Sequence, residues 1–454
     1  MTQEMLLKKY NREVPRYTSY PTVPFWKEWM HAKDYVDNFK TNFDKYNQGE
    51  GISLYLHLPF CESLCSFCGC NKLITANHDV EEKYLNAVIG EWYLYRRLMG
   101  AKPIIRELHL GGGTPTFFSP GNLKRMLDCI FDIADIHPQR AFSLEGHPNN
   151  TTRSHLEILQ QFGFTRISLG VQDYDPDVQR VINRIQPYEN VEQVTQWARQ
   201  TGFTSVNHDL IYGLPLQTLT SVKSTIEKTI ALHPDRIAYY SYAHVPWIKK
   251  NQRLYDENDL PTAEQKMKFY LFSRSLLLLA GYEDIGMDHF ALPGDSLYKA
   301  SLEGGMHRNF MGYTTSYTPF LIGLGVSAIS DTGSAYSQNC KELTNYYRKI
   351  DNSELPLQQG YILDETEVGL RKYIMDIACK GSVIFEPEHT NLLNTYVIPE
   401  LKELANDGLI ILGRRGLKVT GIGKMFLRNI CQAFDLKWKW SQSKSEIPRF
   451  SRSV

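Results

Sequence analysis

From residue 52 onward the chain alternates short apolar or β-branched runs with amphipathic stretches, and this alternation restricts the fold more than any other feature of the sequence. Strands are predicted over residues 52–58, 107–112, 141–146, 166–172, 205–213, 236–245 and 282–290. Helices are predicted over residues 80–99, 120–134, 152–162, 190–201, 217–232 and 263–280. Repeated strand–helix units of about 30 residues or more imply a parallel sheet with helices outside it. We therefore predict an α/β fold whose sheet is a closed or partly closed barrel.

The chain divides into three predicted regions: an N-terminal arm over residues 1–50, a barrel domain over 51–355 and a small, mostly helical C-terminal domain over 356–454. The arm is rich in aromatic and polar residues and is predicted to be irregular with one short helix. The stretch "LANDGLIILGRRGLKVTGIGKMFLRNI" predicts a helix, a β-hairpin and a helix, an order typical of a winged helix. We favour a packing role for this stretch over DNA binding, and residues 441–454 are predicted to form a polar tail.

The balance of charged residues excludes few functions, but it does not favour a polyanionic binding partner. Lys and Arg together number 50, as do Asp and Glu, so the formal net charge is zero. This gives no general reason to expect nucleic acid or an anionic membrane surface as a partner. The N-terminal residues lack the apolar core of a secretory signal. The longest apolar run, "SLLLLAGY" at 275–282, is far shorter than the ~18 residues that a membrane span needs. We expect a cytoplasmic protein with no membrane or nucleic-acid partner.

Four of the eight cysteines, Cys61, Cys65, Cys68 and Cys70, fall inside ten residues directly after the first predicted strand. In a reducing cytosol, clustered cysteines indicate metal or redox chemistry rather than cross-links. A structural zinc site usually uses two separated C-x2-C pairs, and the loop offers no second pair. Three thiolates from one loop can hold an iron–sulfur cluster and leave one iron free to bind a small molecule. A zinc site that uses all four cysteines is the alternative.

Glycines and polar residues lie where a βα barrel places its chemistry. Gly111, Gly112 and Gly113 follow the second predicted strand and let the backbone approach a ligand closely, although three glycines alone usually mean a tight turn. Polar residues also lie at or near the carboxyl ends of predicted strands, which is the catalytic end of such barrels. They are Glu145, Gln172, Asp209, Tyr242 and His244. The alternative is that polar residues simply resume where strands end.

The spacing C-x3-C-x2-C after the first strand, with the aromatic Phe67 before the third cysteine, resembles the motif of the radical S-adenosylmethionine (SAM) superfamily. Over nearly its whole length the chain resembles the oxygen-independent coproporphyrinogen III oxidases (coproporphyrinogen dehydrogenases) of haem biosynthesis. The stretches that carry this resemblance are "PRYTSYPT" (15–22), "YLHLPFCESLCSFCGCNK" (55–72), "HLGGGTPT" (109–116), "LGVQDYDPDVQRVINR" (169–184), "DLIYGLP" (209–215), "IGMDHFA" (285–291), "HRNFMGYTT" (307–315), "GLGVSAIS" (323–330) and "LRNICQAFD" (427–435).

The resemblance implies a partial (β/α)6 TIM-like radical SAM barrel and a set of cofactor ligands. It implies a [4Fe-4S] cluster on Cys61, Cys65 and Cys68, whereas Cys70 is needed for activity without being a ligand. It also implies two SAM molecules, with Glu145 for an ammonium or ribose group, Asp209 for ribose and Arg184 with Gln172 for a carboxylate. The SAM-binding positions that it implies are Tyr55, Phe67, Gly112, Gly113, Thr114, Glu145, Gln172, Arg184, Asp209, Ala243 and Ile329. The second SAM would be lined in part by the last two.

The reaction implied by the resemblance is the oxidative decarboxylation of two propionate side chains of coproporphyrinogen III to vinyl groups, which gives protoporphyrinogen IX. A 5′-deoxyadenosyl radical made from SAM would remove a hydrogen atom from the β-carbon of each propionate. The enzyme would need an electron donor for the cluster and a terminal electron acceptor. Arg16 and Arg308 are candidates for holding the substrate carboxylates. A monomer is expected, because in the family the chain itself covers the barrel mouth.

The sequence departs from the family pattern at two places. Gly146 and His147 stand where Val-Asp is usual, and Met311 stands where Gln helps to bind the second SAM. Because a Met side chain cannot donate a hydrogen bond, we expect weaker or altered binding of the second SAM.

Three alternatives to coproporphyrinogen oxidation remain. They are a radical SAM enzyme that acts on another tetrapyrrole, a haem chaperone, and a zinc-stabilised nucleic-acid binder. The arm and Cys70 argue against the chaperone.

Overall fold

The computed structural model of the chain describes residues 3–28 and 32–441. Its largest element in these residues is a 13-stranded sheet with the order β1-β17-β16-β15-β14-β2-β5-β6-β7-β8-β9-β11-β10. The strands β2 and β5 to β9 run parallel to one another, and β14 runs parallel to β2. Their bounds are Ile52–Leu58 (β2), Ile104–Gly112 (β5), Asp135–Gly146 (β6), Phe164–Gln172 (β7), Ser205–Tyr212 (β8), Arg236–Ser241 (β9) and Leu321–Leu324 (β14).

Antiparallel strands extend the parallel core at both edges. Beyond β14 lie β15 (Ile329–Asp331), β16 (Ala335–Asn339), β17 (Leu357–Ile362) and β1 (Lys27–Glu28); beyond β9 lie β11 (His289–Ala291) and β10 (Glu283–Gly286). Since β1 and β10 end the strand order, the described sheet is open, and the predicted partial barrel is confirmed. The prediction of a single strand over 282–290 is wrong. Met287 and Asp288 have positive φ angles of 43° and 71°, which reverse the chain between β10 and β11.

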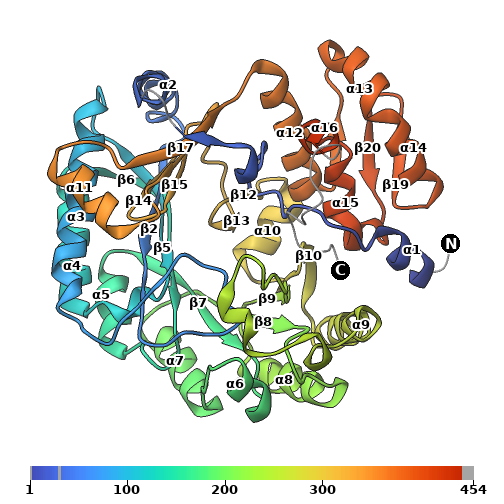
Figure 1. Cartoon of the computed structure of the whole chain (residues 1–454), viewed down its shortest axis with the longest axis horizontal. Helices are drawn as coiled ribbons and strands as arrows, with labels where there is room; N and C mark the ends of the chain where they lie inside the picture. The colour runs from blue at the N-terminus through green and yellow to red at the C-terminus, as the bar shows by residue number, and fades with distance from the viewer. Residues whose placement is uncertain (1–2, 29–31, 442–454) are drawn as a thin grey trace.

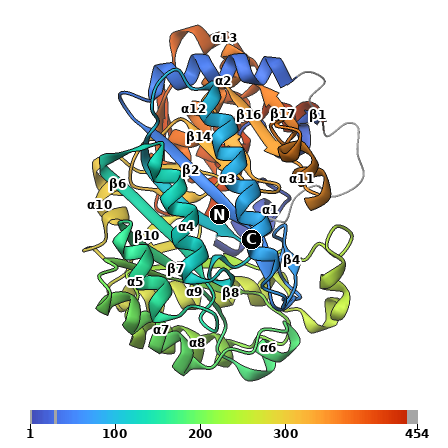
Figure 2. The same ribbon diagram turned by 90° about the vertical axis from the view of Figure 1, so that its left-hand side faces the viewer.

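Helices cover the outer face of the sheet, as Figures 1 and 2 show. These are α3 (Val80–Leu98), α4 (Pro120–Asp132), α5 (Arg153–Gln161), α6 (Pro176–Val181), α7 (Tyr188–Gln200), α8 (Leu219–Leu232) and α9 (Ala263–Leu279). Side-chain oxygens of Ser119, Thr152, Thr218 and Thr262 cap α4, α5, α8 and α9, and such caps are each worth about 1 kcal/mol. The predicted helices are thus confirmed to within about two residues at each end, and α6 is an addition.

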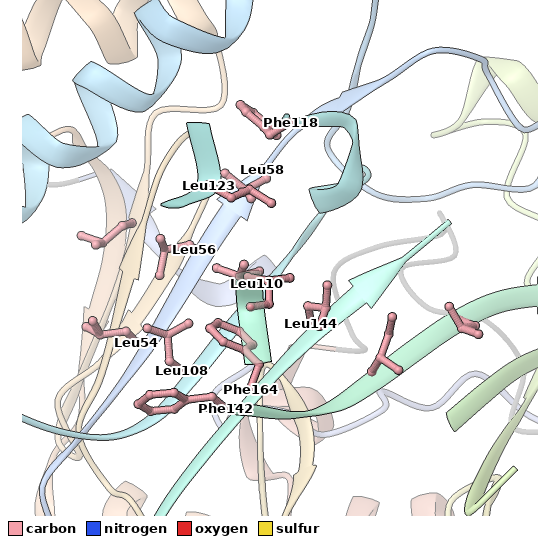
Figure 3. Packing of buried hydrophobic residues seen from close by; sticks show 14 of the residues in the cluster. Leu54, Leu56, Leu58, Leu108, Leu110, Phe118, Leu123, Phe142, Leu144 and Phe164 are labelled. Atoms are coloured by element: carbon pink, nitrogen blue, oxygen red, sulfur yellow. The ribbon is translucent and has the colours of Figure 1, made fainter. Parts of the chain in front are cut away.

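The two-residue period of the strands separates an apolar outer face from a polar lumen. In β2, the side chains of Ile52, Leu54, Leu56 and Leu58 are fully buried against the covering helices. Figure 3 shows this layer continuing through Leu108, Leu110, Phe142 and Leu144 of the next strands. Each such side chain stabilises the fold by roughly 1.5–3 kcal/mol through burial. The alternate residues of the same strands, Tyr55 and His57 among them, therefore face the lumen.

The arm contains two described helices, α1 (Gln3–Tyr10) and α2 (Ala32–Tyr46), so the prediction of one short helix is wrong. Tyr35, Phe39 and Phe43 recur every four residues along α2, and all three are fully buried in the main core. Between the helices, residues 14–20 pack against the C-terminal helices through Val14, Tyr17 and Tyr20. Tyr17 also donates a hydrogen bond to Asp435 at 3.0 Å.

The C-terminal elements form a second core beside the barrel (Figure 1). They are α12 (Glu365–Lys380), β18 (Ser382–Ile384), α13 (Thr390–Tyr396), α14 (Ile398–Asn406), β19 (Ile410–Gly413), β20 (Gly416–Val419), α15 (Leu427–Gln432) and α16 (Leu436–Ser441). The predicted order of helix, hairpin and helix is confirmed by α14, β19, β20 and α15. The predicted polar tail lies outside the described residues, apart from Ser441.

Smaller elements complete the described chain: β3 (Phe60–Cys61), β4 (Leu73–Ile74), α10 (Ser296–Glu303), β12 (His307–Asn309), β13 (Gly312–Thr314) and α11 (Leu343–Asp351). The main sheet takes β1 from the first predicted region and β17 from the third. The division at residues 50 and 355 stays a prediction. In the described part of the chain, no helix combines the length and apolarity that crossing a bilayer requires.

Candidate active site

The cysteine loop follows β2 at its carboxyl end, where β3 and β4 pair and close the base of the loop. All four cysteines carry free thiols; Cys65 is buried and Cys70 is exposed. The hydrogen bond between Cys68 and Cys70 lowers the pKa of Cys68 and raises that of Cys70, so the thiolate of this pair forms on Cys68. In residues 3–28 and 32–441, no three His, Cys, Asp or Glu side chains converge on the position of one metal ion.

Two amides from a distant segment hold the loop in shape. Asn251 Nδ2 donates to the carbonyls of Cys65, Ser66 and Cys68 at 3.2, 2.8 and 3.2 Å. Gln252, which is buried, donates from Nε2 to the carbonyls of Phe67 at 3.2 Å and Ala243 at 3.1 Å. Both belong to the 3-10 turn η3 (Lys250–Leu254), which follows β9. The sequence analysis missed these two residues, which lie about 185 positions from the loop that they anchor.

The glycine run packs against the start of the cysteine loop. Gly113 N donates to the Leu58 carbonyl at 2.8 Å, and a Cβ added at Gly113 would lie 2.4 Å from the carbonyl oxygen of Pro59. Gly112 has a φ of 118°, and its added Cβ would lie 2.8 Å from the His57 ring. Next in the chain, the Thr114 hydroxyl is 3.3 Å from Cys61 Sγ. Only glycine fits this close approach of β5 to the end of β2.

Glu145 is held at the end of β6 by two neighbours. Its Oε2 accepts a hydrogen bond from Gly112 N at 3.2 Å, and its Oε1 lies 3.5 Å from His109 Nε2. Burial alone would raise the pKa of Glu145, but the His109 ring and the Gly112 amide more than offset it, so the pKa is lowered. His109 also stacks on Tyr55 and bonds Ser143 through Nδ1 at 2.8 Å. Glu145 is therefore a carboxylate positioned to bind a cationic group or a hydroxyl group.

Tyr55 and His57 form a second polar pair in the lumen. His57 Nε2 lies 2.9 Å from the carbonyl of Asn71, an acceptor, so this nitrogen carries the proton. Burial lowers the pKa of His57, and the neutral ring therefore accepts the Tyr55 hydroxyl hydrogen at Nδ1, 3.0 Å away. The sequence analysis did not assign roles to His57 or His109. The sequence feature that could have revealed them is a histidine at a lumen-facing position on each of two adjacent strands.

Asp209 lies on β8 among neutral partners. Ser168 Oγ donates to its Oδ2 at 2.8 Å and Asn207 Nδ2 to its Oδ1 at 2.7 Å. Burial raises the pKa of Asp209 to about 7, even though both hydrogen bonds favour the ionised form. This carboxyl group therefore exchanges a proton near neutral pH, unlike Glu145.

Arg184 connects β7 to the cysteine loop. Its Nη2 donates to the Gly170 carbonyl at 2.5 Å, and its Nη1 lies 3.6 Å from Cys65 Sγ. Its Nε is buried and has no hydrogen-bond partner among the described residues. Gln172 ends β7 with a φ of 68°, and its amide lies beside Arg184 over Gly170. The pair leaves a buried donor available to an anionic group.

A cavity occupies the lumen and joins several of these residues. It encloses about 600 Å3, the open mouth included. Glu145 and Asp209 line it, together with Met311 at the tip of the β12–β13 hairpin. The other lining residues are His109, Ser143, Leu144, Arg166, Ser168, Asn207, Arg236, Tyr240, His289, Leu297, Gly312 and Tyr313. Met311 therefore shares a cavity with the two acids.

Of the eleven predicted SAM-binding residues, Glu145 and Asp209 line this cavity and the other nine do not; three of those nine pack in other places. Phe67 packs with Tyr242 and Tyr255 in a small apolar cluster next to the cysteine loop. Ala243 follows β9 and is held by Gln252. Ile329 begins β15 and packs with a cluster around Trp26. The structure thus groups Tyr55, Gly112, Glu145 and Asp209 around the lumen, and places these three at its periphery.

Three arginines surround one acid where the arm meets the barrel. Arg16 bonds the Ser241 carbonyl at 3.1 Å and lies over the Tyr240 ring; Arg428 bonds the carbonyls of Val14 and Pro15. Arg308 is only 8% exposed and lies 4.7 Å from the Tyr313 ring centre. Burial raises the pKa of Asp288, and these arginines counteract the rise. In the described residues, Arg308 Nε and Nη1 have no hydrogen-bond partner.

Residues 55–229 of the chain match the model of the radical SAM superfamily. The chain is 38% identical over 455 residues to oxygen-independent coproporphyrinogen III oxidase of Escherichia coli, covering 99% of this chain and 98% of the relative. It is 37% identical over 438 residues to the enzyme of the same name from Pseudomonas aeruginosa, covering 95% of each. The solved structure of coproporphyrinogen III oxidase from Escherichia coli, described as a radical SAM enzyme, superposes with a TM-score of 0.87 at 36% identity, covering 94% of this chain and 100% of that one.

Proposed function

The chain belongs to the family of oxygen-independent coproporphyrinogen III oxidases within the radical SAM superfamily, and from this premise we propose how its residues oxidise coproporphyrinogen III. The reaction converts two propionate side chains to vinyl groups with loss of CO2. When bound, a [4Fe-4S] cluster and SAM supply the hydrogen abstraction that starts each decarboxylation. The protein binds these groups, orients the substrate and excludes water.

The residues at the end of β2 fit such a cluster. Thiolates are the usual ligands of iron–sulfur clusters, and the loop offers free thiols on a backbone that Asn251 holds in place. We assign Cys61, Cys65 and Cys68 as the ligands. Cys70, the exposed fourth thiol, serves catalysis instead. The single observation that carries the proposal is the packing of Gly113 and Thr114 against this loop, because it brings the cysteines and the lumen acids to one end of the barrel.

The SAM-binding role rests on donors and acceptors at the same end of the barrel. Glu145, ionised and fixed by His109, suits an ammonium or ribose hydroxyl group. Asp209 suits ribose. The unpartnered Nε of Arg184 suits a carboxylate, since a guanidinium binds carboxylates through its planar fork. The proposed SAM-binding set is completed by Tyr55, Phe67, Gly112, Gly113, Thr114, Gln172, Ala243 and Ile329, with Ala243 and Ile329 next to a second SAM.

The substrate carries carboxylates, and the arginines around Asp288 suit them. Arg308 is the strongest candidate because its guanidinium is buried, two of its nitrogens have no hydrogen-bond partner in the described residues, and it shares the acid Asp288 with two other arginines. Burying an unpaired charge is costly unless a ligand supplies the opposite charge. Arg16 lies over the ring of Tyr240 and Arg308 over the ring of Tyr313, and both tyrosines line the lumen cavity. Decarboxylation of each propionate also releases one electron, which passes to a terminal acceptor.

The remaining features of the proposal concern the setting of the enzyme. We propose that it works in the cytoplasm as a monomer, with its own arm and C-terminal helices over the barrel mouth. It needs a protein or small molecule to reduce the cluster and another to accept the last electron. The neutral net charge supports no nucleic-acid partner.

An anaerobic turnover assay tests the function. The protein is reconstituted with iron and sulfide, then supplied with SAM, a reductant and coproporphyrinogen III, and the products are identified by chromatography. We expect protoporphyrinogen IX, measured after oxidation as protoporphyrin, together with 5′-deoxyadenosine. 5′-Deoxyadenosine without protoporphyrin would contradict the substrate and point to another tetrapyrrole. Stable haem binding without either product would indicate a haem chaperone, and zinc in place of iron a zinc protein.

Three cysteine variants separate the assigned roles. Cys61→Ser is expected to lower bound iron and abolish both products. Cys70→Ser is expected to keep bound iron and lose protoporphyrin. Cys129→Ser, a half-buried cysteine on α4, serves as the matched control and should keep both. Iron loss in Cys70→Ser equal to that in Cys61→Ser would contradict the division between ligands and catalytic thiol.

A further inference from the structure

Four neighbouring strands each place one polar side chain at the same level of the lumen. Tyr55 on β2 is paired in register with His109 on β5. Ser143 on β6 is the partner of His109, and Arg166 on β7 is the partner of Ser143. The leucine and phenylalanine side chains next to them in the chain belong to the outer apolar layer of Figure 3. Because successive side chains alternate between the two faces and adjacent strands lie about 4.8 Å apart, these four polar groups face the lumen within reach of one another.

Three of these side chains form a continuous series of hydrogen bonds that ends at an acid. Arg166 Nη2 donates to Ser143 Oγ at 3.0 Å. Ser143 Oγ lies 2.8 Å from His109 Nδ1, and His109 Nε2 lies 3.5 Å from Glu145 Oε1. Ser143 and His109 are only 3% and 8% exposed, so bulk water does not compete for these bonds. We call Arg166, Ser143 and His109 the Arg166 chain.

The Arg166 chain has one direction. A guanidinium can only donate hydrogen bonds, so Ser143 Oγ accepts from Arg166. The Ser143 hydroxyl has one hydrogen to donate, and among the described residues its only acceptor within reach is His109 Nδ1. Nδ1 therefore carries the lone pair, and the ring hydrogen is on Nε2, the nitrogen that faces Glu145. The arginine thus determines, through the serine, which nitrogen of His109 donates to the acid.

Arg166 is suited to this role because its hydrogen bonding serves nothing else. Ser143 is its only hydrogen-bond partner in the described part of the chain, and Glu107 and Asp295 act on its charge only from a longer distance. The other lumen arginine, Arg236, is instead paired directly with Asp295 at 2.7 Å. Burial lowers the pKa of Arg166 to about 10, which leaves the guanidinium charged and a pure donor at neutral pH.

The second acid of the lumen shows what the same arrangement does without a cation. Ser168 donates to Asp209 at 2.8 Å and accepts a hydrogen bond from the neutral amide of Asn207 at 2.7 Å. The pKa of Asp209 is raised to about 7, whereas that of Glu145 is lowered, with His109 among the causes. The chain that begins at a cation thus ends at the acid that stays ionised.

We propose that Arg166 is a positioning residue for SAM binding. It acts through Ser143 and His109, which fix the carboxylate of Glu145 with its free lone pairs toward the lumen. Gly112 N donates to the other oxygen of the same carboxylate at 3.2 Å, so each oxygen keeps one fixed donor and remains an acceptor for a ligand. No proton is transferred, because the chain only fixes where the protons are. The proposal rests on the proposed function in taking Glu145 as a ligand of SAM.

The first experiment locates the ring proton by nitrogen NMR spectroscopy of reconstituted enzyme that contains isotope-labelled histidine. The signals of His109 are those that His109→Gln removes. We expect a protonated Nε2 and an unprotonated Nδ1 that accepts a hydrogen bond. The Nδ1 signal should shift in Ser143→Ala, because its donor is lost, and should return in Ser143→Thr. A proton on Nδ1 in wild type, or an unshifted signal in Ser143→Ala, would overturn the proposal.

The second experiment measures the affinity for SAM by calorimetry, without turnover. Arg166→Met keeps a side chain of similar length and removes the donor, and we expect SAM to bind about 2- to 10-fold more weakly, the effect of one hydrogen bond. Arg166→Lys keeps a charged donor and should recover most of the affinity. The matched control is Ser53→Ala, which removes a buried serine hydrogen bond to Glu107 on the neighbouring strands and should leave the affinity unchanged.

Turnover of the same variants separates indirect from direct action. If Arg166→Met raises KM for coproporphyrinogen and leaves the SAM affinity unchanged, Arg166 holds a substrate carboxylate itself and the proposal is overturned. A loss of SAM affinity in Ser143→Ala that Arg166→Met does not share would also overturn it, because the chain would then begin at the serine. Failure of the substrate assignment has a separate signature: the proton position and the SAM affinities follow the expected pattern, and wild-type enzyme forms 5′-deoxyadenosine without protoporphyrin.

Discussion

The substitution Arg308→Met tests whether the buried arginine exists for the substrate or for the fold. Arg308 lies on β12, is 8% exposed and has two guanidinium nitrogens without a hydrogen-bond partner among the described residues. Its favourable interactions are with the ring of Tyr313, 4.7 Å away, and with the carboxyl group of Asp288, which it shares with Arg16 and Arg428. Met has a similar length and no charge, so the variant removes the cation without opening a large cavity.

Two magnitudes distinguish the roles. A hydrogen bond from a charged donor to a substrate carboxylate contributes about 1.5–3 kcal/mol. Its loss therefore lowers kcat/KM for coproporphyrinogen about 10- to 150-fold. For the fold, removing buried unsatisfied donors stabilises by about 1–3 kcal/mol, and losing the ring contact costs about 0.5–2 kcal/mol. We therefore expect the free energy of unfolding to change by no more than about 2 kcal/mol.

The assays are anaerobic steady-state turnover and urea unfolding of the same preparations. We expect KM for coproporphyrinogen to rise in Arg308→Met while SAM binding is unchanged. The matched control is Arg371→Met, because Arg371 is also a buried arginine but is paired with Asp331. Breaking that buried pair is expected to lower the free energy of unfolding by about 3–5 kcal/mol and leave KM unchanged.

A reversal of these outcomes would refute the reasoning. If Arg308→Met lowers the free energy of unfolding as much as Arg371→Met does and leaves KM unchanged, Arg308 is a structural residue and the substrate carboxylates bind elsewhere.

Three further predictions concern other parts of the site. Glu91 on α3 is fully buried, and burial raises its pKa to about 8. Its contribution to the free energy of unfolding is therefore complete below pH 4.5 and is lost as the pH rises through 8. Urea unfolding across this range should show the loss in wild type and not in Glu91→Gln. Asn251→Ala removes the hydrogen bonds to three loop carbonyls and should lower iron incorporation, measured by iron analysis. The exposed control Asn258→Ala should not lower it. Equal iron content in both variants would contradict the anchoring role of Asn251. Met311→Gln adds a hydrogen-bond donor to the lumen cavity. One hydrogen bond contributes about 0.5–1.5 kcal/mol, so calorimetry should show roughly 2- to 10-fold tighter binding at the weaker SAM site. Two SAM sites of equal affinity in wild type would contradict this prediction.

The parallel core could be predicted because its signals are local. The strand β2 shows fully buried residues at every second position, and the helices that follow begin at Ser or Thr caps. The cysteine loop was placed correctly because it directly follows a strand, and the ends of parallel strands share one edge. In the same way Glu145 and Asp209 were expected to meet at the lumen, and both line its cavity.

The errors came from weaker local signals. The helix α2 was missed although Tyr35, Phe39 and Phe43 repeat every four residues, because its polar remainder resembles a loop. The turn between β10 and β11 was missed because Met287 adopts a positive φ that its residue type does not favour, although Gly286 and Asp288 on either side tolerate one.

Other features depend on contacts that no local pattern encodes. Asn251 and Gln252 are ordinary polar residues in a polar stretch, and only the fold shows that they anchor a loop far away in the sequence. The arginines on the lumen face of β7 and β9, Arg166 and Arg236, could have been noticed at alternate strand positions. Their depth in the barrel, which lowers the pKa of Arg166 to about 10, follows only from the curling of the sheet into a partial barrel.

The attachment of the arm to the last helices has a consequence for the order in which the molecule is made. Arg428 holds the carbonyl of Pro15 across 413 residues of chain. At about 5–20 residues per second, a ribosome needs roughly 20–80 s to synthesise the residues between them. All parallel strands of the barrel precede Arg428 and are complete before the arm has its partner. During synthesis the arm therefore waits for its partner until the final helices emerge, after the parallel strands are complete.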